Sequence, residues 1–176
     1  MTCRSFCTAA MLMVVLLTGA WADSPGQDDL DKATDAKLRA RTLRDLGEVI
    51  DLCQSALNKG LDKQAEAFAR QMLASTLIQR GLVTARGIFE NPRPDPAWPK
   101  IREVALADLE RGAKLDPTQA DAFLSIARLQ LLPGGKRQRA IQALDQAVKA
   151  GADTPDVRAR ALVLRSGLAE DPKRRR

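Results

Sequence analysis

The stretches ALADLERGAKLDP at residues 105–117 and AIQALDQAVKAGA at residues 140–152 decide the fold of this 176-residue chain. When one is shifted onto the other by 35 positions, small residues align with small ones and large with large. The shared pattern is a small residue, a leucine four positions later and a small residue three beyond: Ala105, Leu109 and Gly112, then Ala140, Leu144 and Ala147. Two helices of a hairpin approach closely only where small side chains face bulky ones, so this internal repeat predicts stacked helical hairpins.

Helical spacing continues on the amino-terminal side of the repeat. Apolar residues recur at three- and four-residue steps over residues 43–57, as on one face of a helix. Asp62 is a candidate cap for a second helix that runs to about Phe89. The proline-rich stretch at 91–99 predicts a loop, because prolines lack the amide donor, and Pro99 suits the first turn of the next helix.

On the carboxyl-terminal side, turn signals separate the remaining helices. Residues 116–117, Asp-Pro, end the first repeat helix, and Thr118 with Asp121 resembles a capping box for the next one. Residues 133–135, Pro-Gly-Gly, mark a tight turn, and Pro155 suits the first position of a last helix. Because no stretch beyond the first 22 residues alternates with period two over a strand's length, the sequence predicts an all-α fold.

These residues resemble the tetratricopeptide repeat family, whose unit is about 34 residues long. The second-helix pattern of the family, which ends in a proline, is matched in order by Ala105, Leu109, Gly112 and Pro117. Phe123 and Ala127 fit the family's first helix, whereas Ala152 stands where the next unit should carry proline. The match is good over residues 100–168 and loose over 34–99. The resemblance implies about two and a half antiparallel hairpins in a short right-handed superhelix; unrelated amphipathic helix pairs are the alternative.

The resemblance also implies a binding groove. In this family the first helices of successive units line a concave wall that commonly holds peptides. Carried over from the family pattern, the groove residues here would be Leu124, Arg128, Leu131, Arg158, Leu162 and Arg165. The arginines could grip a carboxylate or an acidic segment. Solvated arginines are the alternative, since the family's carboxylate clamp uses lysine and asparagine and Leu124 occupies one of the lysine places.

Residue types that carry chemistry are scarce in this chain. It contains no histidine, which is the commonest general base and the commonest transition-metal ligand. After residue 22 the only cysteine is Cys53, on an apolar helical stripe, which predicts a buried structural thiol; a redox role or an intermolecular disulfide is the alternative. No serine has a visible base partner. We therefore expect no enzymatic activity, no metal and no cofactor.

The first 22 residues are typical of a cleavable signal peptide. Arg4 gives a positive start, an apolar run covers residues 9–17, and residues 20–22, Ala-Trp-Ala, place small side chains before a cleavage site after Ala22. The apolar run is shorter than the roughly 20 residues that span a bilayer. We expect export to a periplasm or out of the cell, with no membrane span after cleavage.

The formal net charge of +6 is concentrated at one end, where Lys173, Arg174, Arg175 and Arg176 supply four of the positive charges. The rest of the chain has no basic stripe with interleaved aromatic residues, so we expect no specific nucleic-acid binding. The expected organisation after the leader is a flexible segment at 23–33, the helical repeat domain at 34–169 and a disordered basic tail at 170–176.

Together these features favour a non-catalytic exported adaptor that binds a partner peptide or protein through a groove. One alternative is a structural module that self-associates through its terminal helix, where Leu162 and Val163 would lie outside the preceding hairpin. Others are a shortened accessory part of a larger exported repeat protein, and a chain that binds anionic polymer through its basic tail.

Overall fold

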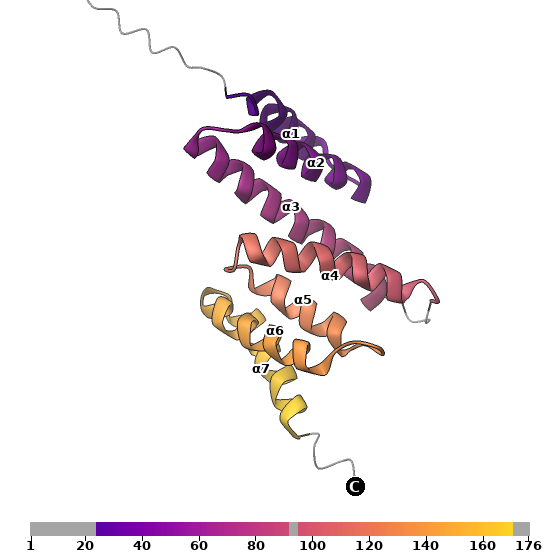
Figure 1. The fold of residues 1–176 in the computed structure, drawn as a ribbon. Helices are drawn as coiled ribbons and strands as arrows, with labels where there is room; N and C mark the ends of the chain where they lie inside the picture. The colour runs from indigo at the N-terminus through magenta and orange to yellow at the C-terminus, as the bar shows by residue number, and fades with distance from the viewer. Residues whose placement is uncertain (1–23, 92–94, 171–176) are drawn as a thin grey trace, which may run out of the picture.

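The computed structural model describes residues 24–91 and 95–170, which form an elongated stack of helices with no strand in that range (Figure 1). The helices are α1 (Gln27–Arg39), α2 (Leu43–Lys59), α3 (Lys63–Phe89), α4 (Trp98–Leu115), α5 (Ala120–Leu131), α6 (Arg137–Ala150) and α7 (Pro155–Glu170), with a short 3-10 turn, η1 (Gly151–Asp153), before α7. The all-α prediction is confirmed. The expected leader, the basic tail from residue 171 onward, and two prolines of the loop, Pro92 and Pro94, lie outside the described residues.

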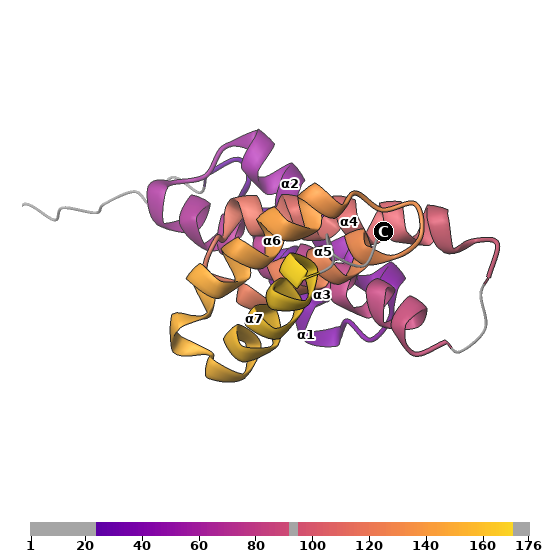
Figure 2. The same ribbon diagram turned by 90° about the horizontal axis from the view of Figure 1, so that it is seen from below.

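Each helix packs against the next one along the chain, so α1 pairs with α2, α3 with α4 and α5 with α6, and α7 follows. Alternate helices also touch, because α1 contacts α3, α3 contacts α5 and α5 contacts α7. Seen from below, α2, α4 and α6 lie towards one side of the stack and α1, α3 and α7 towards the other (Figure 2). The described chain thus contains one helix pair more than the two and a half expected.

The difference arises because α1, which was not predicted, pairs with the predicted helix α2; α1 begins inside the segment at 23–33 that is expected to be flexible. That expectation is wrong for residues 27–33, whose Leu30 and Ala33 are buried against α2 and α3. The buried carboxylate of Asp29 accepts hydrogen bonds from the Ser55 hydroxyl at 2.5 Å and from Lys59 Nζ at 2.7 Å, which attach α1 to α2. An acidic, mostly polar sequence therefore docks through very few apolar side chains.

Two of the three predicted features at helix starts are present in the structure, and one is not. The Asp62 carboxylate caps α3 by accepting from the backbone N–H groups of Gln64 and Ala65 at 2.8 and 2.9 Å, as predicted. The capping box predicted at Thr118 and Asp121 does not form. Instead the Asp116 carboxylate accepts from the backbone and hydroxyl of Thr118, at 3.1 and 2.6 Å, so the Thr118 hydroxyl is directed back towards the preceding turn. Pro155 begins α7 as predicted.

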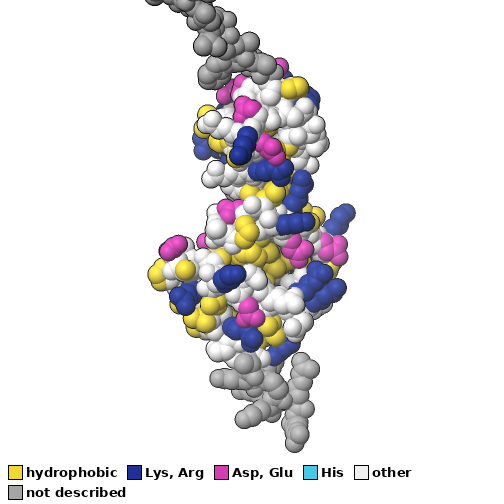
Figure 3. All heavy atoms as spheres, turned by 60° about the vertical axis from the view of Figure 1, so that its left-hand side comes forward, with side chains coloured by type: hydrophobic (Ala, Val, Ile, Leu, Met, Phe, Trp, Pro, Cys, Tyr) yellow, Lys and Arg dark blue, Asp and Glu magenta, His cyan; other side chains and the backbone are white. Residues whose placement is uncertain are grey.

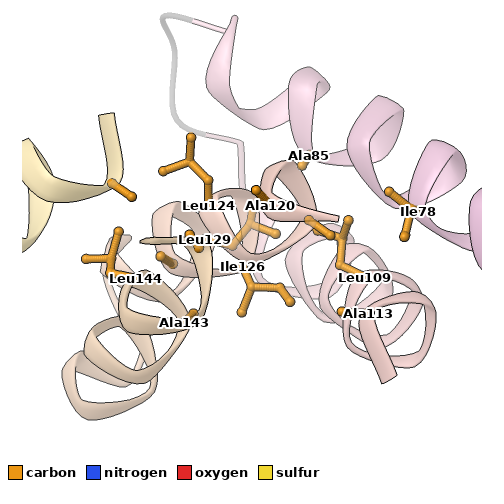
Figure 4. Close-up of a cluster of buried hydrophobic side chains, with 14 of the residues drawn as sticks. Ile78, Ala85, Leu109, Ala113, Ala120, Leu124, Ile126, Leu129, Ala143 and Leu144 are labelled. Atoms are coloured by element: carbon orange, nitrogen blue, oxygen red, sulfur yellow. The ribbon is translucent and has the colours of Figure 1, made fainter. Parts of the chain in front are cut away.

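Three clusters of buried hydrophobic side chains lie along the stack, and α3 contributes to the two larger ones, which form the main cores, as well as to the third. Met72, Leu73 and Leu77 pack with α1 and α2, whereas Ile78, Ala85 and Ile88 pack with α4 and α5. Figure 4 shows the larger core, in which side chains from α3, α4, α5 and α6 converge. With 27 residues, α3 extends about 40 Å, long enough to span both cores. The expected length of this helix, to about Phe89, is confirmed.

Two glycines set the distance between α3 and α4. A Cβ at Gly81 of α3 would lie 2.7 Å from Leu109 Cγ and 3.2 Å from the Ala105 carbonyl oxygen. A Cβ at Gly112 of α4 would lie 2.6 Å from Ile78 Cγ1 on α3. The small residues of the repeat therefore bring the helices together as the sequence pattern predicts, because each helix carries a glycine where the other carries a bulky side chain.

Replacing Gly81 with alanine should therefore destabilise the protein by about 1–3 kcal/mol, because the added methyl group overpacks the contact with Leu109. Gly87 is the matched control, since it lies in the same helix and a Cβ there would meet nothing within 4 Å. Gly87→Ala should stabilise by about 0.5–1 kcal/mol through helix propensity alone. Urea unfolding followed by circular dichroism measures both. Equal stabilisation by the two variants would contradict close α3–α4 packing.

Asp29 should make the docking of α1 depend on acidity. Hydrogen bonds from Lys59 and then Ser55 lower the pKa of this carboxyl below its ordinary 3.8. A lowered pKa stabilises the fold above the unfolded value, and this contribution disappears as the pH falls through the folded pKa. Asp29→Asn should thus have a lower urea midpoint than the wild type at pH 7, and the difference should shrink below about pH 4. A difference that stays constant down to pH 3 would refute this role.

A groove across the faces of α3, α5 and α7

Two hollows lie side by side where the alternate helices α3, α5 and α7 meet. The first, of about 410 Å³, lies between α3 and α5 and includes Phe89 and Ser125 in its lining. The second, of about 370 Å³, lies between α5 and α7 and has Leu124 and Val163 among its apolar lining residues. Arg128 borders both hollows, and we call the two hollows together the groove.

The α5 side of the groove follows from helical spacing. Asp121, Ser125 and Arg128 stand four and three residues apart, so they share the face of α5 that meets the end of α3. Leu124, one turn before Arg128, is buried and forms the apolar floor of the hollow towards α7. From α7, Ala159 and Val163 stand four residues apart and supply the opposite wall.

Arg128 is the exposed cation of this groove that has no acidic partner among the described residues. Its Cζ lies 3.9 Å from the centroid of the Phe89 ring, a cation–π contact that fixes the guanidinium over α3. The other two arginines of the groove are engaged: Arg160 pairs with Asp156 at 2.8 Å and with Asp121 at 3.8 Å, and Arg86 with Glu90 at 3.7 Å. Stacking on an aromatic ring leaves the guanidinium N–H donors of Arg128 available for a ligand.

The structure divides the six predicted groove residues between separate surfaces. Leu124 and Arg128 line the groove, and Leu131 lies at the end of α5, 36% exposed. On α7, Arg165 Nε donates to Asp145 Oδ1 of α6 at 2.9 Å. Arg158 lies against the η1 turn, where its Cβ would be 3.2 Å from a Cβ at Gly151. Leu162 is half exposed and does not line the described hollow. Of the three predicted groove arginines, only Arg128 lines either hollow.

The α7 residues that line the groove, Ala159, Arg160 and Val163, are missed by the sequence analysis. The predicted positions on α7 are out of register by one residue, and one residue corresponds to a rotation of about 100° around the helix axis. The family spacing of 34 residues carries Arg128 onto Leu162, whereas the 35-residue spacing of the second helices carries it onto Val163 and Leu124 onto Ala159. The signal was thus present in the sequence, in the longer turn at residues 133–135.

Two buried polar groups lie away from the groove and hold helices together. The Arg80 guanidinium of α3 donates twice to the buried Asp108 carboxylate of α4, both at 2.7 Å, and this contact raises the pKa of Arg80. Cys53 is fully buried, and burial raises the pKa of its thiol to about 11. The prediction of a buried thiol at Cys53 is confirmed, and a thiol held in this state is a poor nucleophile.

The surface of the described residues has mixed charge. On the face shown in Figure 3, basic and acidic side chains alternate around exposed hydrophobic ones, so that face carries no continuous basic field. Within the described ranges, no group of three or more candidate ligand side chains is placed to hold a metal ion. No helix in the same ranges combines the length and the apolar character that a bilayer crossing requires.

No family model, curated protein or solved structure matches this chain.

Proposed function

We propose that this chain is a non-catalytic adaptor of tetratricopeptide-like architecture, which holds a segment of a partner protein in the groove of α3, α5 and α7. The contacts among alternate helices support this architecture, because a superhelix of hairpins requires first helices that touch one another along one wall. The reciprocal glycine contacts between α3 and α4 support it as well, since the family pattern requires small residues there.

The observation that carries the binding proposal is the environment of Arg128. It combines a charge without an acidic partner among the described residues, a fixed position over Phe89, and an apolar hollow next to it. A partner segment with a carboxylate beside an aliphatic or aromatic side chain would complement both features. Hydrogen bonds between a guanidinium and a carboxylate are strong and geometrically specific, and the apolar hollow adds burial of the neighbouring side chain.

The partner is tested by photocrosslinking in the cell that makes the protein. A photoreactive amino acid in place of Val163, which is 71% exposed at the groove, should capture a defined partner band. The matched control places the same amino acid at Leu38, which is 77% exposed at the other end of the stack. Arg128→Gln should reduce capture at Val163 by about tenfold, whereas Arg139→Gln, on an exposed arginine of α6, should not. Equal capture from positions 163 and 38, or an equal effect of Arg128→Gln and Arg139→Gln on capture at Val163, would refute binding in the groove.

We further propose that the adaptor acts after export, in a periplasm or outside the cell. The support is the sequence of residues 1–22, with its positive start, its apolar run and the small residues before Asp23.

Cleavage after Ala22 gives a direct prediction. The chain expressed from residues 1–176 and recovered from the envelope or the medium should begin at Asp23, because small side chains at 20 and 22 fit a signal peptidase. Intact-mass spectrometry measures this, and Ala22→Arg should block processing and retain the chain in the membrane fraction. A recovered protein that still begins at Met1 would contradict the proposal.

A further inference from the structure

A separate hollow, of about 490 Å³, lies between α2 and α4 and shares no lining residue with the groove. Both helices pack on α3, which contributes the third wall, and both lie on one side of the stack (Figure 2). The α4 wall follows from helical spacing, because Arg111, Lys114 and Leu115 stand three and four residues apart on one face. On α3, Arg70 and Leu73 stand three residues apart in the same way. We call this cavity the α2–α4 hollow.

The charged side chains of the α2–α4 hollow are all basic. Its lining includes Arg70, Arg111 and Lys114 and no acidic residue. Arg70 is paired along α3 with Glu66, at 2.6 Å. Arg111 and Lys114 have no acidic partner among the described residues. Once the pairing of Arg70 is allowed for, the hollow therefore keeps two positive charges that the described part of the chain does not neutralise.

The acidic residues of α4 near these two cations are engaged with other groups. The pairs are Asp108 with Arg80 of α3, Glu110 with Arg139 of α6, and Asp116 with Thr118 and Gln119 of the following turn. A concave surface that carries one sign of charge beside apolar walls focuses the electrostatic field and concentrates counter-ions. The ligand that complements this hollow is therefore an anion.

The apolar part of the lining is suited to an aliphatic body. Leu73 is buried, Leu57 is half-buried, and Leu115 is 36% exposed at the end of α4. All three border the α2–α4 hollow. Small-molecule sites have volumes of about 300–1,000 Å³ and combine apolar side chains with a few polar groups that orient the ligand. The α2–α4 hollow has both the volume and this combination.

We propose that the α2–α4 hollow binds a small organic anion with an aliphatic body, of the kind represented by a medium-chain carboxylate. The carboxylate lies between Arg111 and Lys114, where the guanidinium donates two directed hydrogen bonds and the ammonium a third. The aliphatic chain covers Leu57, Leu73 and Leu115 and is removed from water. This site does not rest on the proposed function of the groove, because the two sets of lining residues are separate.

Octanoate tests this site by nuclear magnetic resonance of the full chain with labelled leucine methyl groups. It should shift the signals of Leu57, Leu73 and Leu115 with a dissociation constant of about 0.1–1 mM, as expected for a ligand with few atoms. Acetate lacks the aliphatic body and octanol lacks the charge, so each should bind about tenfold more weakly.

Three outcomes of this titration overturn the proposal. The first is octanol binding as tightly as octanoate, because the cations would then have no role. The second is a set of shifts confined to Leu124, which would place the anion in the groove beside Arg128. The third is the absence of shifts at Leu57, Leu73 and Leu115 at about 10 mM octanoate.

Substitution of Arg111 tests the cation directly. Arg111→Gln should weaken octanoate binding about tenfold, because the guanidinium makes the directed hydrogen bonds to the carboxylate. Arg44→Gln is the matched control, since it makes the same substitution at an exposed arginine in the first turn of α2, outside the hollow. Circular dichroism checks that both variants are folded. Unchanged affinity in Arg111→Gln, or equal weakening by the two variants, overturns the site.

Discussion

The close approach of α3 and α4 is the constraint on which the rest of this structure depends. Gly81 and Gly112 each face a bulky side chain of the other helix, so the two backbones lie nearer than any larger residue would permit. Because α3 also packs on α1 and α2, this contact joins the amino-terminal core to the core that supports the groove. The direction of α3 places Phe89 at the end of the helix, beneath Arg128. The groove cation is thus positioned by glycines more than one helix turn away.

The ion pair between the partly exposed Arg80 and the buried Asp108 lies at the same junction and fixes how α3 and α4 are aligned. Apolar packing tolerates small sliding movements of one helix along another, whereas two hydrogen bonds of 2.7 Å between a guanidinium and a carboxylate fix one register. Burial makes such a pair an uncertain source of net stability, because desolvation offsets the attraction. Its larger effect is on specificity, since any shifted register of α3 on α4 would leave a buried charge without its partner.

Much of this fold is predictable from sequence because its determinants are local. Apolar spacing, the Asp62 cap and the proline at 155 give helix positions that the structure confirms. Two features were missed, and each has a physical reason. Helix α1 is polar in most of its residues, and it is held by Leu30, Ala33 and the bonds to Asp29, which are contacts with partners distant in the sequence. On α7 the wrong residues were predicted to line the groove. A helix turns by about 100° per residue, so one extra residue in a preceding turn brings a different face of the helix to the groove.

The same turn explains why the partner is harder to infer than the fold. With the spacing of 35 residues, Arg128 of α5 aligns with Val163 of α7, and both border the hollow between these helices. One is a cation and the other an aliphatic residue, although the repeat aligns small with small and large with large at its packing positions. The packing pattern that determines the stack therefore leaves the groove positions free to differ in chemistry. In the proposed adaptor this difference would set the recognition, with a carboxylate suited to one end of the hollow and an apolar side chain to the other.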